Sequence, residues 1–274
     1  MSAPPPALLL VAHGSRDPRH AATVGALCAR VRVLLPGVRV EAGFLDFDAP
    51  TVPTALERLY EEGAREIVAL PLLLTRAFHA KTDIPAVLAD AAARLPGATV
   101  RQADVLGPHP LLTAALERRL RQTGLDPRQA PSTGIVLASA GSSDPEAIAV
   151  IAEVAREWRR TTGWCAVRPA FASAALPRTA DAVRALRADG VRRVAVAPYV
   201  LAPGLLPDRI AAGAREAGAD VLAPVLGAAP ELARLAALRY AALSVGRGTL
   251  GPCLTTSESR PKTSPPALVS TTRS

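Results

Sequence analysis

Three side chains in the first half of the chain could act together on a metal ion or a proton. His13, Asp46 and His79 each follow a short apolar segment of the kind that forms a buried strand. The carboxyl ends of parallel strands meet at one edge of a sheet, where ligands bind, so these side chains can converge. Two imidazoles and a carboxylate suit a divalent first-row metal such as Fe, Co or Ni. Imidazoles also transfer protons near neutral pH.

Each of these residues also has a purely structural interpretation. His13 could brace its loop, His79 could lie on the surface, and Asp48 could be the functional acid while Asp46 caps a turn. The loop HGSRDP at residues 13–18 carries Gly, Ser and Asp, which helix starts need for capping, and a proline suited to a first helical position. His20 and His109 are expected to be structural.

Strand-like and helix-like segments alternate through the first half. Strands are expected at 7–11, 38–44, 66–70 and 99–105, and helices at 19–35, 51–62, 84–95 and 110–121. Pro36-Gly37, Gly63 and Pro96-Gly97 end three of these helices. The alternation predicts an α/β fold with a four-stranded parallel sheet and helices on both faces.

The pattern then repeats. IVLASAGSSDP at 135–145 aligns with LLLVAHGSRDP at 8–18, an offset of 127 that also joins several later positions. We expect a duplicated chain with an N-terminal catalytic lobe at 1–124, a linker at 125–133 and a degenerate second lobe at 134–244. The Thr-, Ser- and Pro-rich segment 245–274 is expected to be a disordered tail.

The two copies differ in chemistry. Ala140 stands where His13 does, Ser173 corresponds to Asp46, and the second copy has two leucines near the position of His79. All four histidines lie in the first half. The duplication therefore predicts one active site rather than two.

Composition excludes several classes of protein. The net charge of +8 is almost entirely arginine, but these arginines are mixed with acids and only 3% of residues are aromatic, so a nucleic-acid partner is not expected. No segment approaches the ~18 apolar residues of a membrane span, and the N-terminus lacks the basic region of a signal peptide. We expect a cytoplasmic protein without a membrane partner. The three scattered cysteines form no disulfide framework or zinc site.

Three motifs carry a family resemblance. HGSRDP, FLDF at 44–47 and PLLLTRAFHAKTDIP at 71–85 resemble the sirohydrochlorin chelatases, the class II tetrapyrrole chelatases of the cobaltochelatase and ferrochelatase type, in their long duplicated form. The resemblance implies the chelatase fold, with two flavodoxin-like lobes facing across a cleft. It also implies a monomer whose second lobe replaces a partner subunit.

The resemblance implies a lyase-class enzyme that inserts Co²⁺ or Fe²⁺, or Ni²⁺, into sirohydrochlorin during sirohaem or cobalamin synthesis. The metal is a substrate, and no permanent cofactor is expected. His13 and His79 match the family's histidines, as metal ligands and proton acceptors. Asp46 matches the family's Glu and would be a third ligand or would orient the others.

The same resemblance suggests how the anionic macrocycle is held. Arg16, Arg76 and Lys81 could pair with substrate carboxylates, and backbone N–H groups of Gly14, Ser15 and Arg16 could receive one at the helix start. A non-catalytic tetrapyrrole or metal carrier is the alternative function. A phosphohistidine phosphohydrolase fits less well, because it would need Arg where Ala12 precedes His-Gly.

Overall fold

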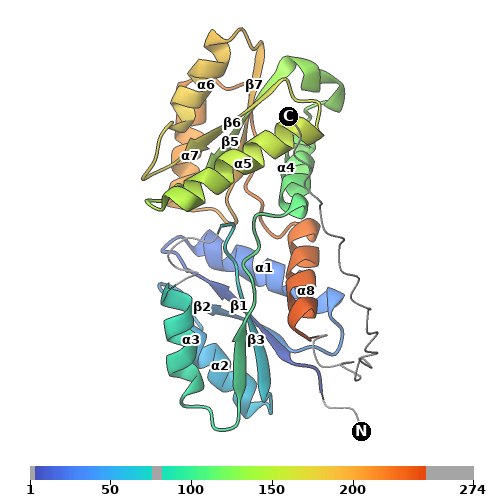
Figure 1. Cartoon of the computed structure of the whole chain (residues 1–274), viewed down its shortest axis with the longest axis vertical. Coiled ribbons are helices and arrows are strands. Elements are labelled where there is room, and N and C mark those ends of the chain that lie inside the picture. The colour runs from blue at the N-terminus through green and yellow to red at the C-terminus, as the bar shows by residue number, and fades with distance from the viewer. Residues whose placement is uncertain (1–3, 76–81, 245–274) are drawn as a thin grey trace, which may run out of the picture.

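Two four-stranded parallel sheets form the two lobes of the molecule (Figure 1). This computed structural model describes residues 4–75 and 82–244. The first sheet has the order β2-β1-β3-β4 and the second the order β6-β5-β7-β8. Their strands are β1 (Ala7–Ala12), β2 (Val40–Phe44), β3 (Glu66–Pro71), β4 (Thr99–Gln102), β5 (Thr133–Ser139), β6 (Ala166–Phe171), β7 (Arg193–Tyr199) and β8 (Val221–Leu222). The predicted α/β class, duplication and four-stranded parallel sheets are confirmed.

Helices cover both faces of each sheet. They are α1 (Pro18–Leu34), α2 (Val52–Glu61), α3 (Ile84–Ala92), α4 (Pro110–Gln122), α5 (Pro145–Thr161), α6 (Thr179–Ala188), α7 (Leu205–Glu216) and α8 (Pro230–Ser244), and the short 3₁₀ helix η2 (Pro127–Ser132) lies in the segment that connects α4 to β5. Among the described residues, none of these helices combines the length and apolarity needed to cross a bilayer. The predicted tail at 245–274 lies outside the described residues.

The same capping chemistry starts the first helix of each lobe. The Asp17 carboxylate accepts a hydrogen bond from the backbone N–H of Arg19 at 2.9 Å, and Asp144 accepts one from Glu146 at 2.9 Å. The hydroxyls of Ser15 and Ser142 accept from the following aspartate's N–H. These bonds satisfy N–H groups that a helix start otherwise leaves without partners. The serine and the aspartate that the two copies of the motif share therefore have a structural role.

Alternate residues of β1 enter two different cores, as the period of a strand requires. Leu8 and Leu10 pack into a core that runs through both lobes, and Leu9 and Val11 pack under α2 and α3 on the outer face. The second lobe has its own outer core under α6 and α7. The inner core is continuous between the lobes, so it fixes them against one another.

The last helices of the two repeats are exchanged. α4 packs on β7 of the second lobe, and α8 packs on α1 and β3 of the first (Figure 1). The Arg118 guanidinium of α4 pairs with Glu231 of α8 at 3.1 Å, and the Tyr240 hydroxyl of α8 donates to the Pro6 carbonyl at 2.7 Å. The predicted domain boundaries, with a linker at 125–133, stay a prediction. In the packed structure, each lobe also includes the last helix of the other repeat.

Candidate active site

Two loops at the carboxyl edge of the first sheet are held together by their backbones. The N–H of Leu45 donates to the Ala12 carbonyl at 3.0 Å, and the N–H of Asp46 donates to the His13 carbonyl at 2.9 Å. Gly14 adopts a φ of +95°, and a Cβ there would lie 1.7 Å from the Asp46 carbonyl oxygen. Only glycine fits this close approach. The fold therefore brings the His13 and Asp46 positions together as predicted.

His13 lies exposed at the rim of a cleft. Its ring stacks at 6.4 Å from the Phe47 ring with an interplanar angle of 27°. The Arg16 guanidinium lies 5.3 Å from the centre of the same ring. Phe47 is 53% exposed, which is unusual for a large apolar side chain. An imidazole, an aromatic ring and a guanidinium thus share one accessible surface.

The two acids of this loop have different surroundings. Asp46 is exposed and accepts a hydrogen bond from the Phe47 N–H at 2.8 Å. Asp48 is half-buried, and its Oδ2 accepts from the Ser15 N–H at 3.0 Å. Asp48 therefore helps fix the histidine-bearing loop, while Asp46 faces outward. A metal-binding role for Asp46 stays a prediction.

His20 of α1 also lines the cleft, which the interpretation of His20 as structural did not anticipate. Its Nδ1 is buried, makes no hydrogen bond within the described part of the chain, and lies 3.7 Å from Asp48 Oδ2. Burial lowers the pKa of His20 against the opposing effect of the Asp48 carboxylate. The imidazole is therefore neutral near pH 7. His109, by contrast, caps α4 by accepting from the Leu111 N–H, as a structural residue.

The cleft between the lobes has a volume of about 490 Å³. The first lobe lines it with His13, His20 and the segment 72–75, and the second lobe with residues 139–142, the start of α5 and residues 199–207. Most of these side chains are apolar, and the imidazoles and hydroxyls converge from the sheet edges. A mainly apolar concave site with a few polar groups is the usual form of a small-molecule site.

The duplication supplies an internal comparison at this cleft. At the offset of 127, six polar or aromatic side chains of the first lobe correspond to alanine or serine in the second. The pairs are His13/Ala140, Arg16/Ser143, His20/Ala147, Asp46/Ser173, Phe47/Ala174 and Asp48/Ala175. The backbone is retained, since the Ser173 N–H donates to the Ala140 carbonyl at 3.0 Å as Asp46 does to His13. This comparison could have revealed His20 and Asp48 from the sequence.

Three predicted site residues, Arg76, His79 and Lys81, lie outside the described residues. Within residues 4–75 and 82–244, no group of three or more His, Cys, Asp or Glu side chains is arranged to hold a metal ion. The set of His13, His79 and Asp46 therefore stays a prediction. Gly14, Ser15 and Arg16 lie together at the start of α1, beside the cleft.

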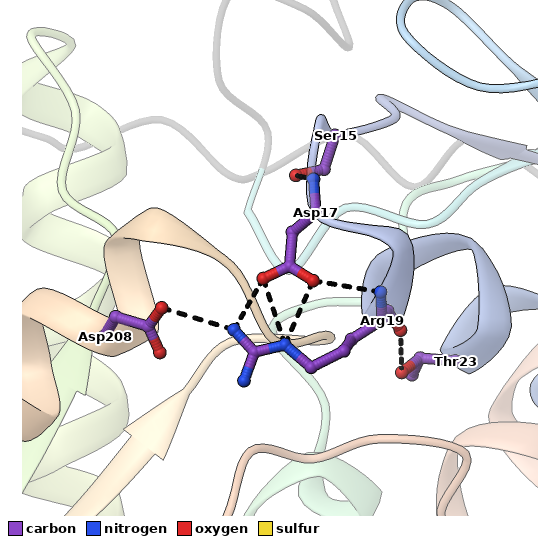
Figure 2. A network of polar contacts seen from close by, with 5 residues as sticks. All are labelled: Ser15, Asp17, Arg19, Thr23 and Asp208. Atoms are coloured by element: carbon purple, nitrogen blue, oxygen red, sulfur yellow. Dashed lines mark hydrogen bonds and ion pairs between the residues drawn. The ribbon is translucent and has the colours of Figure 1, made fainter.

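A charged contact joins the lobes near this site. Arg19 of α1 binds the Asp17 carboxylate and also reaches Asp208 of α7, with 3.2 Å between Arg19 Nη2 and Asp208 Oδ2 (Figure 2). The hydrogen bonds from Arg19 lower the pKa of Asp17 to about 2. Asp208 follows the cleft-lining segment 199–207, so the contact connects the two walls.

The geometry defines a class of protein. It is a duplicated α/β chain in which two lobes form a cleft, and the imidazoles that line this cleft, among the described residues, come from the first lobe. The CbiX family model matches residues 7–123 and 134–243. The chain belongs to the CbiX family.

Known relatives agree with this assignment over nearly the whole chain. A sirohydrochlorin ferrochelatase of Priestia megaterium is 28% identical over 246 residues, covering 88% of this chain and 92% of the relative. SirB from Bacillus subtilis with Fe³⁺ has a TM-score of 0.78 at 27% identity, covering 89% of this chain and 98% of that structure. SirB from Bacillus subtilis subspecies spizizenii in complex with cobalt has a TM-score of 0.74 at 25% identity, covering 89% and 97%.

Proposed function

We propose that this chain is a sirohydrochlorin chelatase that inserts Co²⁺ or Fe²⁺ into the macrocycle. The observation that carries this proposal is the chemistry of the cleft: His13 and His20 of the first lobe line it, and their counterparts in the second repeat, which also line it, are Ala140 and Ala147. The relatives named as sirohydrochlorin ferrochelatases support the reaction. Relatives named as cobaltochelatases leave Co²⁺ equally open.

Metal insertion requires that a divalent ion be held and released to the ring nitrogens, and that two N–H protons leave those nitrogens for an acceptor as the ion binds. The exposed His13 imidazole can serve both needs, first as a ligand and then as a proton acceptor. His79 is proposed as the second ligand and Asp46 as the third or as an orienting group. An open site of this kind releases its ion more readily than a closed four-ligand site.

The chain's own residues also position the macrocycle. The apolar walls suit the flat ring, and Phe47 offers an exposed aromatic face. We propose that Arg16, Arg76 and Lys81, with the backbone N–H groups of residues 14–16, bind its peripheral carboxylates. Because the second lobe forms the opposite wall, we propose a monomer, which light scattering during size-exclusion chromatography would verify.

The test is an anaerobic absorbance assay with sirohydrochlorin and Co²⁺ or Fe²⁺. We expect insertion to exceed the rate without protein, and His13→Ala to fall to about that rate while still binding the macrocycle. Asp46→Ala should slow insertion, and Ser173→Ala, its counterpart in the second lobe, should not. Equal rates with and without wild-type protein would contradict the proposal.

A carrier is the second candidate, because it would use the same cleft. It would bind sirohydrochlorin or the metal without accelerating insertion, and His13→Ala would leave most of its function intact. The two outcomes of the absorbance assay therefore separate the enzyme from the carrier. A phosphohydrolase would instead cleave a chromogenic phosphate ester in a His13-dependent manner.

A further inference from the structure

A second depression, of about 570 Å³, lies at the other edge of the second sheet. It is formed by the residues that precede β5 and β7 and by the start of β6, whereas the cleft lies where these parallel strands end. Three arginines line it, Arg159, Arg168 and Arg192, together with one acidic residue, Asp189. The equivalent positions of the first lobe hold three arginines and two glutamates, so the excess of positive charge is smaller there.

The first lobe shows how the equivalent of Arg159 is normally satisfied. Arg32 occupies the corresponding position in α1, and its Nε donates to the Val40 carbonyl at 2.8 Å. Its Nη2 pairs with Glu41 at 2.8 Å. In the second lobe Arg168 replaces Glu41, so the depression that Arg159 lines holds a second arginine where the first lobe has the carboxylate that binds Arg32.

Arg192 also lacks the partners that its first-lobe equivalent, Arg65, has. In the first lobe, Arg65 donates to the Tyr60 carbonyl at 2.9 Å, and its guanidinium lies 4.0 Å from the centre of the Tyr60 ring. Arg187 replaces Tyr60 in the second lobe and binds Asp220 at 2.6 Å. The ring that held the arginine in the first lobe is therefore absent beside Arg192.

As a result, the guanidinium groups of Arg159 and Arg192 are available to bind a ligand. Across residues 4–75 and 82–244, the side chains of Arg159 and Arg192 make no hydrogen bond or ion pair. Arg168 is held by Asp189, which leaves about two positive charges without a partner in the depression. Arginine forks bind carboxylate and phosphate oxygens in pairs, and several such groups around one hollow favour an anion with more than one charge.

We propose that this depression binds a small multivalent oxyanion, a polyphosphate or a polycarboxylate, at a site separate from the cleft. The anion takes the place of the carboxylate and the aromatic ring that satisfy the equivalent arginines of the first lobe. It bridges Arg159 and Arg192, with Arg168 fixed between α5 and the turn at 189–192 by its ion pair.

Isothermal titration of the full-length protein, at an ionic strength of about 0.1 M or lower because exposed charges are screened, tests the proposal. Sodium pyrophosphate and citrate are the probes, and acetate is the monovalent control. We expect saturable binding of at least one multivalent anion and none of acetate. Which of the two binds more tightly distinguishes phosphate from carboxylate as the natural ligand class.

The double variant Arg159→Gln/Arg192→Gln should weaken this binding by about tenfold or more, since charge-assisted hydrogen bonds are lost. Arg30→Gln/Arg121→Gln removes the same charge from exposed arginines elsewhere and should bind as wild type does. Arg168→Glu, which places the first lobe's residue at the position equivalent to Glu41, should also weaken binding. All variants should retain metal insertion and the wild-type circular dichroism spectrum.

Two results would overturn the proposal. One is the absence of saturable binding of either multivalent anion to the wild-type protein. The other is equal weakening by the two double variants, which would mean that the anions respond only to overall charge. Neither result bears on metal insertion in the cleft, so the proposal and the chelatase assignment fail separately.

Discussion

At the scale of single residues, comparison of the two repeats distinguishes residues that build the fold from residues that could take part in the reaction. Ser15 and Asp17 recur as Ser142 and Asp144 with the same capping bonds, so their presence in the histidine loop reflects helix formation. His20 does not recur, since the second lobe has Ala147, and it faces the cleft. A side chain retained in only one copy is therefore a better guide to function than the motif itself.

His20→Gln should lower kcat for metal insertion by about tenfold or more, because it removes a neutral imidazole that lines the cleft above Asp48. The absorbance assay measures this effect. His109→Asn is the matched control, since it removes an imidazole outside the cleft and keeps a capping acceptor for α4. An unchanged kcat in His20→Gln would limit this residue to packing.

Asp17 makes folding sensitive to acid. Its pKa of about 2 in the folded protein lies below the ordinary value near 3.8, so the folded state favours the carboxylate. This stabilisation is complete above about pH 4 and is lost as pH falls through the folded pKa. Exposure to solvent keeps it modest.

Asp17→Asn should therefore be less stable than wild type above about pH 4 and equally stable near pH 2. Urea unfolding over that range measures the difference in the free energy of unfolding. Asp144→Asn changes the equivalent cap, which lacks the arginine, and should show a smaller dependence on pH. A difference for Asp17→Asn that does not vary with pH would contradict the expectation.

At the scale of elements, glycine determines how the loop after each first strand docks on the loop after the second. Gly14 and Gly141 have φ values of +95° and +90°, and a Cβ would approach the carbonyl oxygens of Asp46 and Ser173 to 1.7 and 1.9 Å. Both loops need this approach, although only one carries the reactive side chains. The loop geometry is therefore independent of the reactive side chains that one of the two loops carries.

Gly14→Ala and Gly141→Ala should each destabilise the fold by ~2 kcal/mol or more, through backbone strain and the clash with a carbonyl. Gly14→Ala should also impair metal insertion more strongly, because it displaces His13 from Asp46. Gly25→Ala, in the open interior of α1, should stabilise by about 0.5–1 kcal/mol instead. Thermal unfolding together with the absorbance assay measures both effects, and equal activity in the two loop variants would contradict the expectation.

At the scale of the whole molecule, the exchanged helices make the lobes interdependent. Glu117 of α4, from the first repeat, accepts hydrogen bonds at 2.6 Å from the indole N–H groups of both Trp158 and Trp164 in the second. Both indoles are buried, at 1% and 6% exposure. The second lobe therefore depends on a helix that the first repeat contributes.

Glu117→Leu should destabilise the protein by ~2–4 kcal/mol, because it leaves two buried indole N–H groups without an acceptor. Since these are the chain's two tryptophans, their fluorescence reports this contact directly. Wild type should show one unfolding transition by fluorescence and by loss of metal insertion alike. Two separate transitions would mean that the lobes fold independently.

Much of the fold was predictable because its signals are local. Apolar segments, helix caps and the offset of 127 identified the strands, the helices and the repeat. The fourth strand is shorter than expected, Thr99–Gln102 rather than 99–105, since pairing with β3 ends at Gln102. The exchange of α4 and α8 could not be read from the repeat, because either sheet offers a similar apolar face to either helix.

The sequence by itself determined which strand ends carry His13 and Asp46, because parallel strands place their carboxyl ends at one edge. The tertiary structure alone decided that His20 turns toward the cleft, that Asp48 holds the loop through Ser15, and that two arginines of the second lobe find no partner among the described residues. These properties depend on distances between side chains from separate elements, and such distances arise only when the elements pack.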